Sequence, residues 1–186
     1  MQTINPEDVG FSPARLRRLD AVMQRYVDEG KLAGVITLLA RRGEAAHCEC
    51  FGVADLEDQT PMQFDALFRI FSMTKPITSV ALLMLYEEGH FQLSDPVSRF
   101  IPEFKETQVL AEAKEDEWRT TDVERESTLH DLFTHTAGLA YGLDRSSPVD
   151  VRYQKEGVLR MDEPLSDKVK RIAALPLAHQ PGEVWK

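Results

Sequence analysis

The sequence FRIFSMTKPIT, residues 68–78, leads into the apolar run at residues 77–85 and decides how the whole chain is interpreted. The pattern predicts a helix that opens near Ser72, with Lys75 three residues further on. Side chains at this spacing lie on the same helical face, so the hydroxyl and the amine can meet one turn apart. A serine hydroxyl is a weak nucleophile until a base takes its proton, and a neutral lysine can be that base. The spacing therefore predicts a nucleophile with an adjacent base.

The neighbours of this pair support the same interpretation. Ile70, Phe71, Met73 and Ile77 are apolar, and burial among such side chains favours the uncharged form of a lysine. A helix N-terminus also offers free backbone N–H groups, one of which can bind a developing oxyanion. Taken alone, however, a serine at a helix start is more typical of an ordinary helix cap, so the rest of the sequence has to decide.

Two further blocks follow in the sequence. They are LFTHTAGL at residues 132–139, which continues through Tyr141 and Gly142, and QPGEVW at residues 180–185. In this order the three blocks resemble the serine β-lactamase-like superfamily, which includes class C β-lactamases, DD-peptidases and family VIII carboxylesterases. The sequence motifs SMTKP and HTAGLAYG are most similar to those of the esterase branch. The resemblance runs from the first predicted helix to the last residue.

The resemblance implies an acyl-enzyme mechanism in which Ser72 attacks a carbonyl carbon and Lys75 assists as the base. It also implies a tyrosine, in a Tyr-x-Asn or Tyr-Ser-x motif, that follows the QPG block, and a later strand that supplies a second oxyanion donor. The chain stops at Lys186, before both features. The tyrosine near a family block, Tyr141, is interpreted as structural. We therefore expect the 186 residues to be the N-terminal part of a longer enzyme.

The expected fold class is α/β (α+β), β-lactamase/transpeptidase-like, with an antiparallel sheet flanked by helices and an additional helical region. Residues 1–186 are expected to be the N-terminal part of one domain. Within it, residues 1–90 would hold a helix, a β-hairpin and the nucleophile helix, and residues 91–186 would be mainly helical or loop. The sheet is expected to be incomplete, because only two convincing strands are visible and two strands are marginal alone.

Local signals predict the individual elements. Ser12 and Pro13 are typical of a helix start, and Gly30 of its end. Residues 34–40 and 45–53 predict an antiparallel hairpin joined by a turn at 41–44. The helix that follows Lys75 is apolar on nearly every face, which predicts a position between two layers of the protein.

The second half of the sequence is less regular. Residues 93–97 predict a turn into a short helix, residues 128–135 a helix that ends before Gly138, and residues 166–175 an amphipathic helix. The segment 106–127 is rich in charge, and we interpret it as a solvated loop or a frayed helix.

Composition limits the classes of function. The chain is 42% hydrophobic and 28% charged, which is a globular balance, and its net charge of −9 argues against nucleic acid as a partner. No apolar run approaches the roughly 20 residues of a membrane span, and the N-terminus shows no secretory pattern. The sequence thus predicts a cytoplasmic protein that acts on a small-molecule ester or amide substrate. It leaves the oligomeric state open.

No cofactor or metal is expected. His47, Cys48 and Cys50 stand close together, but only two of the three can share a strand face, so a structural role is the better interpretation. His135 belongs to the HTAGL block, where it can clamp a turn. No Gly-x-Ser-x-Gly elbow surrounds Ser72, which argues against a Ser-His-Asp triad.

Three functions stay open at this point. A carboxylesterase is favoured. Hydrolysis of β-lactams or of D-amino-acid peptides is the nearer alternative, since it would use the same acyl-enzyme. The alternative from a different class is a noncatalytic binding or scaffold module that keeps the front half of the fold.

Overall fold

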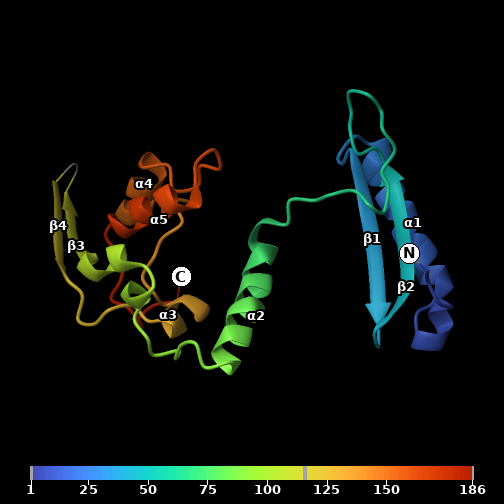
Figure 1. The fold of residues 1–186 in the computed structure, drawn as a ribbon. Coiled ribbons are helices and arrows are strands. Elements are labelled where there is room, and N and C mark those ends of the chain that lie inside the picture. The colour runs from blue at the N-terminus through green and yellow to red at the C-terminus, as the bar shows by residue number, and fades with distance from the viewer. Residues whose placement is uncertain (1, 115–116, 186) are drawn as a thin grey trace. The chain divides into compact units, whose positions relative to one another are not determined.

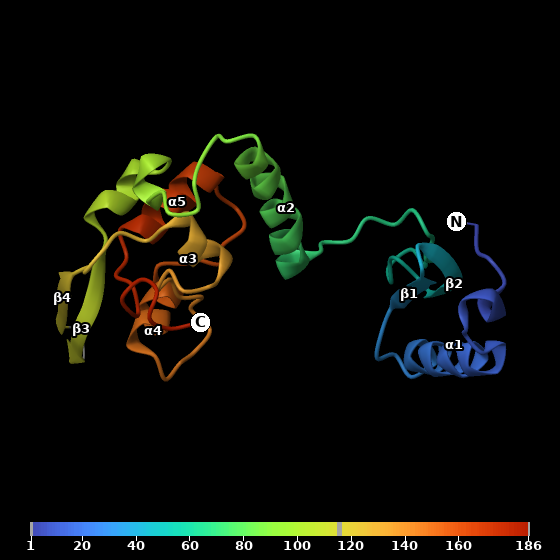
Figure 2. The ribbon, with the colours of Figure 1, turned by 90° about the horizontal axis from the view of Figure 1, so that it is seen from below.

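The computed structural model describes residues 2–114 and 117–185, and the chain forms two compact units, Met1–Phe71 and Ser72–Lys186. Figures 1 and 2 show the first unit in blue to cyan and the second in green to red. The prediction that residues 1–186 belong to one domain stays a prediction.

The first unit is a helix packed on a hairpin. After the 3-10 turn η1 (Pro6–Val9), helix α1 (Pro13–Asp28) leads to strands β1 (Gly34–Arg41) and β2 (Glu44–Gly52). The strands pair antiparallel from Gly34 opposite Gly52 to Arg41 opposite Glu44. The predicted helix and hairpin are therefore confirmed, and α1 lies along the hairpin in Figure 2.

A buried histidine joins α1 to the hairpin. The Nε2 atom of His47 lies 3.0 Å from the Thr37 hydroxyl on β1 and 3.2 Å from a carboxylate oxygen of Asp20 on α1. Cys48 and Cys50 follow on β2 as free thiols. The His47 side chain thus contacts a hydroxyl and a carboxylate that tie the two elements together.

The second unit contains the remaining elements. The 3-10 turn η2 (Phe71–Met73) leads into helix α2. The elements that follow, in chain order, are α2 (Thr74–Glu87), η3 (Val97–Arg99), η4 (Pro102–Glu106), β3 (Gln108–Lys114), β4 (Glu117–Asp122), α3 (Leu129–Phe133), α4 (Pro148–Lys155) and α5 (Leu165–Ala173). Among the described residues, every helix is too short or too polar to span a lipid bilayer.

The charge-rich segment is a hairpin, so its interpretation as a loop or frayed helix is wrong. Strands β3 and β4 pair antiparallel from Gln108 opposite Asp122, with an irregularity between Leu110 and Glu112. Val109 is buried, and its strand bonds to the backbone of Leu177 on its other side. The charged side chains that hid the strands in the sequence lie outside, where Arg119 and Glu112 pair at 3.5 Å.

The core of the second unit surrounds α4, a helix that the sequence reading missed. The buried residues of this core are Ala140, Val149, Tyr153, Val158 and Leu175, and Leu110 and Trp118 of the second hairpin pack against them. A start signal was present, because Ser147 caps the helix with its side chain and Pro148 occupies the first turn.

The central position predicted for helix α2 depends on segments outside the second unit, so it stays a prediction. None of its 14 residues is buried, although the helix is predominantly apolar. The sequence identifies a helix that tolerates burial on all sides, but it does not say which segments cover it. The described residues of the second unit leave these side chains exposed.

Candidate active site

The side chains of Ser72 and Lys75 meet. Ser72 lies in η2, directly before α2, and Lys75 lies in the first turn of α2. The Nζ atom of Lys75 donates a hydrogen bond to Oγ of Ser72 at 3.3 Å. The predicted contact across one helical turn is therefore present. The chemical roles of Ser72 and Lys75 remain a proposal.

The backbone turns sharply just before Ser72. Phe71 has a φ of 44°, in the left-handed region that bulky side chains rarely adopt. Such strain costs about 1–3 kcal/mol and collects at functional sites. The turn places Ser72 at the entrance of α2, with its side chain free to face Lys75.

The expected apolar enclosure of Lys75 is not found. Ile70, Phe71, Met73 and Ile77 are all exposed, from 40% for Ile70 to 68% for Met73, and Lys75 is exposed as well. The described residues of the second unit leave the start of α2 exposed, so the buried amine stays a prediction.

Tyr141 lies beside the pair, which the sequence reading did not foresee. Its ring faces Lys75, with Nζ 5.2 Å from the ring centroid. An ammonium group within about 6 Å of an aromatic face is attracted by the negative potential of the ring. Tyr141 comes directly after the HTAGL block, so residues far apart in the sequence meet at this point.

The loop that carries Tyr141 is fixed by a buried carboxylate of α4. Asp150 is 1% exposed, and its Oδ1 atom accepts hydrogen bonds from the N–H groups of Gly142 at 2.8 Å and Leu143 at 3.2 Å. Gly142 has a φ of 80°, and a Cβ atom there would lie 2.9 Å from the backbone nitrogen of Gln154. The backbone next to Tyr141 is therefore held in place by helix α4.

The second and third sequence blocks pack against each other. The N–H of Gly182 donates to the carbonyl of Thr136, and the N–H of Ala178 donates to the carbonyl of Gly138, both at 2.7 Å. The rings of His135 and Trp185 meet edge to face, with centroids 6.4 Å apart. His135 thus packs against Trp185 of the third block, and the clamping of a turn stays a prediction.

An ion pair between Arg125 and Asp131 lies next to these blocks. Asp131 closes a capping box with Thr128 at the start of α3, and it accepts two hydrogen bonds from the guanidinium of Arg125. Burial by itself would raise the pKa of Asp131, but the bonds from Arg125 and Thr128 hold it well below its usual range.

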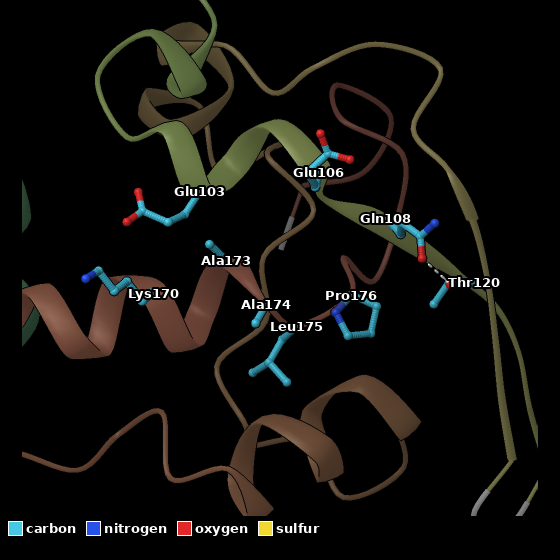
Figure 3. A pocket seen from close by; sticks show the side chains of 9 residues that line it. All are labelled: Glu103, Glu106, Gln108, Thr120, Lys170, Ala173, Ala174, Leu175 and Pro176. Atoms are coloured by element: carbon cyan, nitrogen blue, oxygen red, sulfur yellow. Dashed lines mark hydrogen bonds between the residues drawn. The ribbon is translucent and has the colours of Figure 1, made fainter.

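A hollow elsewhere in the unit is separate from this site. Figure 3 shows it between η4, the end of α5 and β3, with Glu103, Lys170 and Pro176 on its wall and a hydrogen bond from Thr120 to Gln108 at its rim. Ser72 and Lys75 do not line it.

Comparison with known proteins identifies what the chain resembles. Residues 19–186 match the family model described as Beta-lactamase. The chain is 37% identical to esterase EstB of Burkholderia gladioli over 187 residues, which cover 99% of this chain and 45% of that protein. It is 38% identical to an uncharacterized protein of Mycobacterium tuberculosis over 163 residues, or 88% of this chain and 40% of that one.

One solved structure is similar to this chain in its fold. EstCE1, described as a hydrolase with promiscuous acyltransferase activity, superposes with a TM-score of 0.75 at 30% identity, over 91% of this chain and 42% of that one. The fold is thus β-lactamase-like. The chain spans less than half the length of the curated relatives it matches.

Proposed function

Because the chain belongs to the β-lactamase family, whose relatives include esterases and acyltransferases, we propose that Ser72 and Lys75 are the nucleophile and the base of a serine hydrolase acting on carboxylic esters. The observation that carries this proposal is the 3.3 Å contact between Nζ of Lys75 and Oγ of Ser72. It places the amine next to the hydroxyl whose proton it would take, and such contacts are often longer in a site without substrate than during the reaction.

In the proposed reaction, the neutral amine of Lys75 takes the hydroxyl proton while Oγ of Ser72 bonds to the carbonyl carbon of the ester. The tetrahedral intermediate then collapses, the bond to the leaving alkoxide breaks, and the ammonium of Lys75 returns its proton to that oxygen. The acyl group stays on Ser72. In the second half, Lys75 takes a proton from water as the water oxygen bonds to the acyl carbon. The bond between that carbon and Oγ of Ser72 then breaks and the carboxylic acid leaves. Lys75 returns the proton to Oγ, which restores the hydroxyl and the neutral amine.

An ester is the favoured substrate because of the relatives. The chain is similar to a protein named as an esterase over nearly all of its length, and to a hydrolase with acyltransferase activity. β-Lactams and D-amino-acid peptides would form the same acyl-enzyme. They are therefore the alternative substrates of the same proposed site.

We propose further that residues outside this sequence complete the site. The chain matches 45% of esterase EstB, so more than half of that relative has no counterpart here. The proton-relaying tyrosine and the second oxyanion donor that the family resemblance implies would belong to that part. Turnover is accordingly proposed for the longer protein, and acylation of Ser72 is the step to measure.

The experiment is a burst assay with p-nitrophenyl acetate on the protein encoded by the complete reading frame that contains this sequence. We expect one acyl group per chain by intact mass, located on the peptide that contains Ser72 and absent from Ser72→Ala. Ser79→Ala, in the same helix, is the matched control and should be labelled like the wild type. A folded protein without an adduct would refute the hydrolase and favour the noncatalytic module.

A further inference from the structure

We propose that Tyr141 is a positioning residue of this site, whose ring face holds the side chain of Lys75 beside Ser72 and stabilises the positive charge that Lys75 acquires during acylation. This inference rests on the proposed function. It assigns a role in the acylation step to a residue whose sequence context indicated only a structural one.

Two contacts fix the amine. Nζ of Lys75 lies 3.3 Å from Oγ of Ser72 and 5.2 Å from the centroid of the Tyr141 ring. Among the residues that the structure describes, no carboxylate lies within ion-pair distance of Lys75. A lysine side chain that is exposed has many rotamers, and ordering it is costly. The ring is therefore the partner that restricts this side chain to the reactive position.

The sign of the electrostatic effect favours acylation. Lys75 begins the step as a neutral amine and becomes an ammonium as it takes the proton of Ser72. The ring attracts the ammonium much more than the amine, because the attraction acts on charge. The interaction is thus stronger in the transition state than in the reactive ground state, which is the condition for a rate enhancement.

The ring is held rigidly enough for this role. Asp150 is buried in α4 and accepts hydrogen bonds from the two N–H groups that follow Tyr141 in the chain. Tyr141 itself is 37% exposed, so it stays partly accessible while the backbone that follows it is fixed by the core. A flexible loop could not supply a constant distance to Lys75.

The ring and not the hydroxyl carries the interaction. Within the described residues, the phenol oxygen of Tyr141 makes no hydrogen bond, whereas its ring faces Nζ. The proposal therefore differs from a proton relay through a tyrosine, which would need the hydroxyl. Replacing Tyr141 with phenylalanine separates the two.

The test measures the rate constant for acylation of Ser72 by p-nitrophenyl acetate on the alkaline plateau, in the complete protein. Tyr141→Phe should stay within about twofold of the wild type. Tyr141→Leu should be slower by about two- to fivefold, which corresponds to the ~0.5–1 kcal/mol of such pairs at exposed sites. Leu143→Ala, an exposed position in the same loop, is the control and should leave the rate unchanged.

A second series keeps the size of the ring constant. Phenylalanine with one, two or three fluorine atoms at position 141 weakens the negative face stepwise, and the rate should fall with each fluorine toward that of Tyr141→Leu. A flat series, or an equal loss in Tyr141→Phe and Tyr141→Leu, would overturn the role of Tyr141 in a protein that still acylates. A wild type without an adduct on Ser72 would overturn the hydrolase and this inference together.

Discussion

The carboxylate of Asp131 and the guanidinium of Arg125 form a two-pronged ion pair, with nitrogen–oxygen distances of 2.6 and 2.9 Å. The Asp131 side chain is only 3% exposed, and that of Arg125 is 47% exposed. The pair lies against the turn at Gly182, where a Cβ atom would come within 2.1 Å of the Arg125 guanidinium. It therefore joins the start of α3 to the QPG block.

Acid should weaken this pair, and the variant Asp131→Asn should reveal how much the pair contributes to stability. The pKa of Asp131 is lower in the folded than in the unfolded protein, so the unfolded state binds more protons as the pH falls. The pair's stabilisation is complete above the ordinary carboxyl pKa of about 3.9 and is lost as the pH falls below it. We expect Asp131→Asn to lower the free energy of unfolding by about 2 kcal/mol at pH 7 and to flatten its decline in acid.

Urea unfolding followed by tryptophan fluorescence measures this, since Trp118 and Trp185 both lie in the second unit. Asp162→Asn is the matched control, because Asp162 pairs with Arg160 at the surface and should have little effect. An equal loss in both variants would show that the burial of Asp131 is unimportant.

Lys75→Met should separate catalysis from stability. Lys75 is exposed, so its loss should change the free energy of unfolding by less than about 0.5 kcal/mol. Loss of a general base should slow acylation of Ser72 by about 10²- to 10⁴-fold. The burst rate and the melting temperature are compared with those of Lys170→Met, an exposed lysine on α5. Parallel losses of rate and melting temperature in Lys75→Met would contradict the role as base.

Tyr153→Phe should be neutral or stabilising. Tyr153 is fully buried, and the Ala140 backbone lies near its hydroxyl without reaching hydrogen-bond geometry, so within the described residues the oxygen lacks a partner. Removing an unpaired buried hydroxyl costs little, whereas Tyr153→Leu leaves a cavity and should cost about 3 kcal/mol. Equal destabilisation by both variants would show that the hydroxyl is bound.

The same residue predicts sensitivity to alkali. Burial, with a contribution from the charge of Asp150, raises the pKa of Tyr153 to about 12. The folded state therefore resists losing this proton, and the stability it provides is complete below pH 10 and lost as the pH rises through 12. Urea unfolding at pH 9–12 should show a shallower alkaline decline in Tyr153→Phe than in the wild type. Coincident curves would contradict this assignment.

Gly138→Ala should be much more destabilising than Gly89→Ala. Both glycines have a φ near 80°, so alanine costs each position about 1–2 kcal/mol of backbone strain. A Cβ atom at Gly138 would lie 2.3 Å from the carbonyl oxygen of His179, whereas at Gly89 no atom of the described residues lies within 4 Å. We expect a total of about 3 kcal/mol or more at Gly138. Similar values in urea unfolding would show that the backbone near His179 yields easily.

Local signals in the sequence predicted the local structure well. Ser12 and Pro13 marked the start of α1, and the two runs on either side of the turn at 41–44 marked the first hairpin. The contact between Ser72 and Lys75 also follows from helical spacing alone. In each case a signal that spans a few residues, a helix start, a turn or a helical spacing, determines the structure.

Contacts between distant residues could not be predicted in this way. The second hairpin was missed because its charged outer face conceals the few inward residues, such as Val109 and Trp118. The approach of Tyr141 to Lys75 depends on Asp150 and on the packing of α4, and neither produces a periodic pattern in the sequence. The burial of α2 was predicted from its composition, but composition does not identify the segments that would cover a helix.

The exposed apolar side chains of α2 have a practical consequence. Ile77, Val80 and Met84 present about 60% of their surfaces to water, on the helix that begins beside Ser72. Uncovered patches of this kind promote self-association and recognition by chaperones. The second unit produced alone, residues 72–186, would behave as an aggregation-prone polypeptide, and a solubilising fusion partner would be needed before any assay of Ser72 is attempted on it.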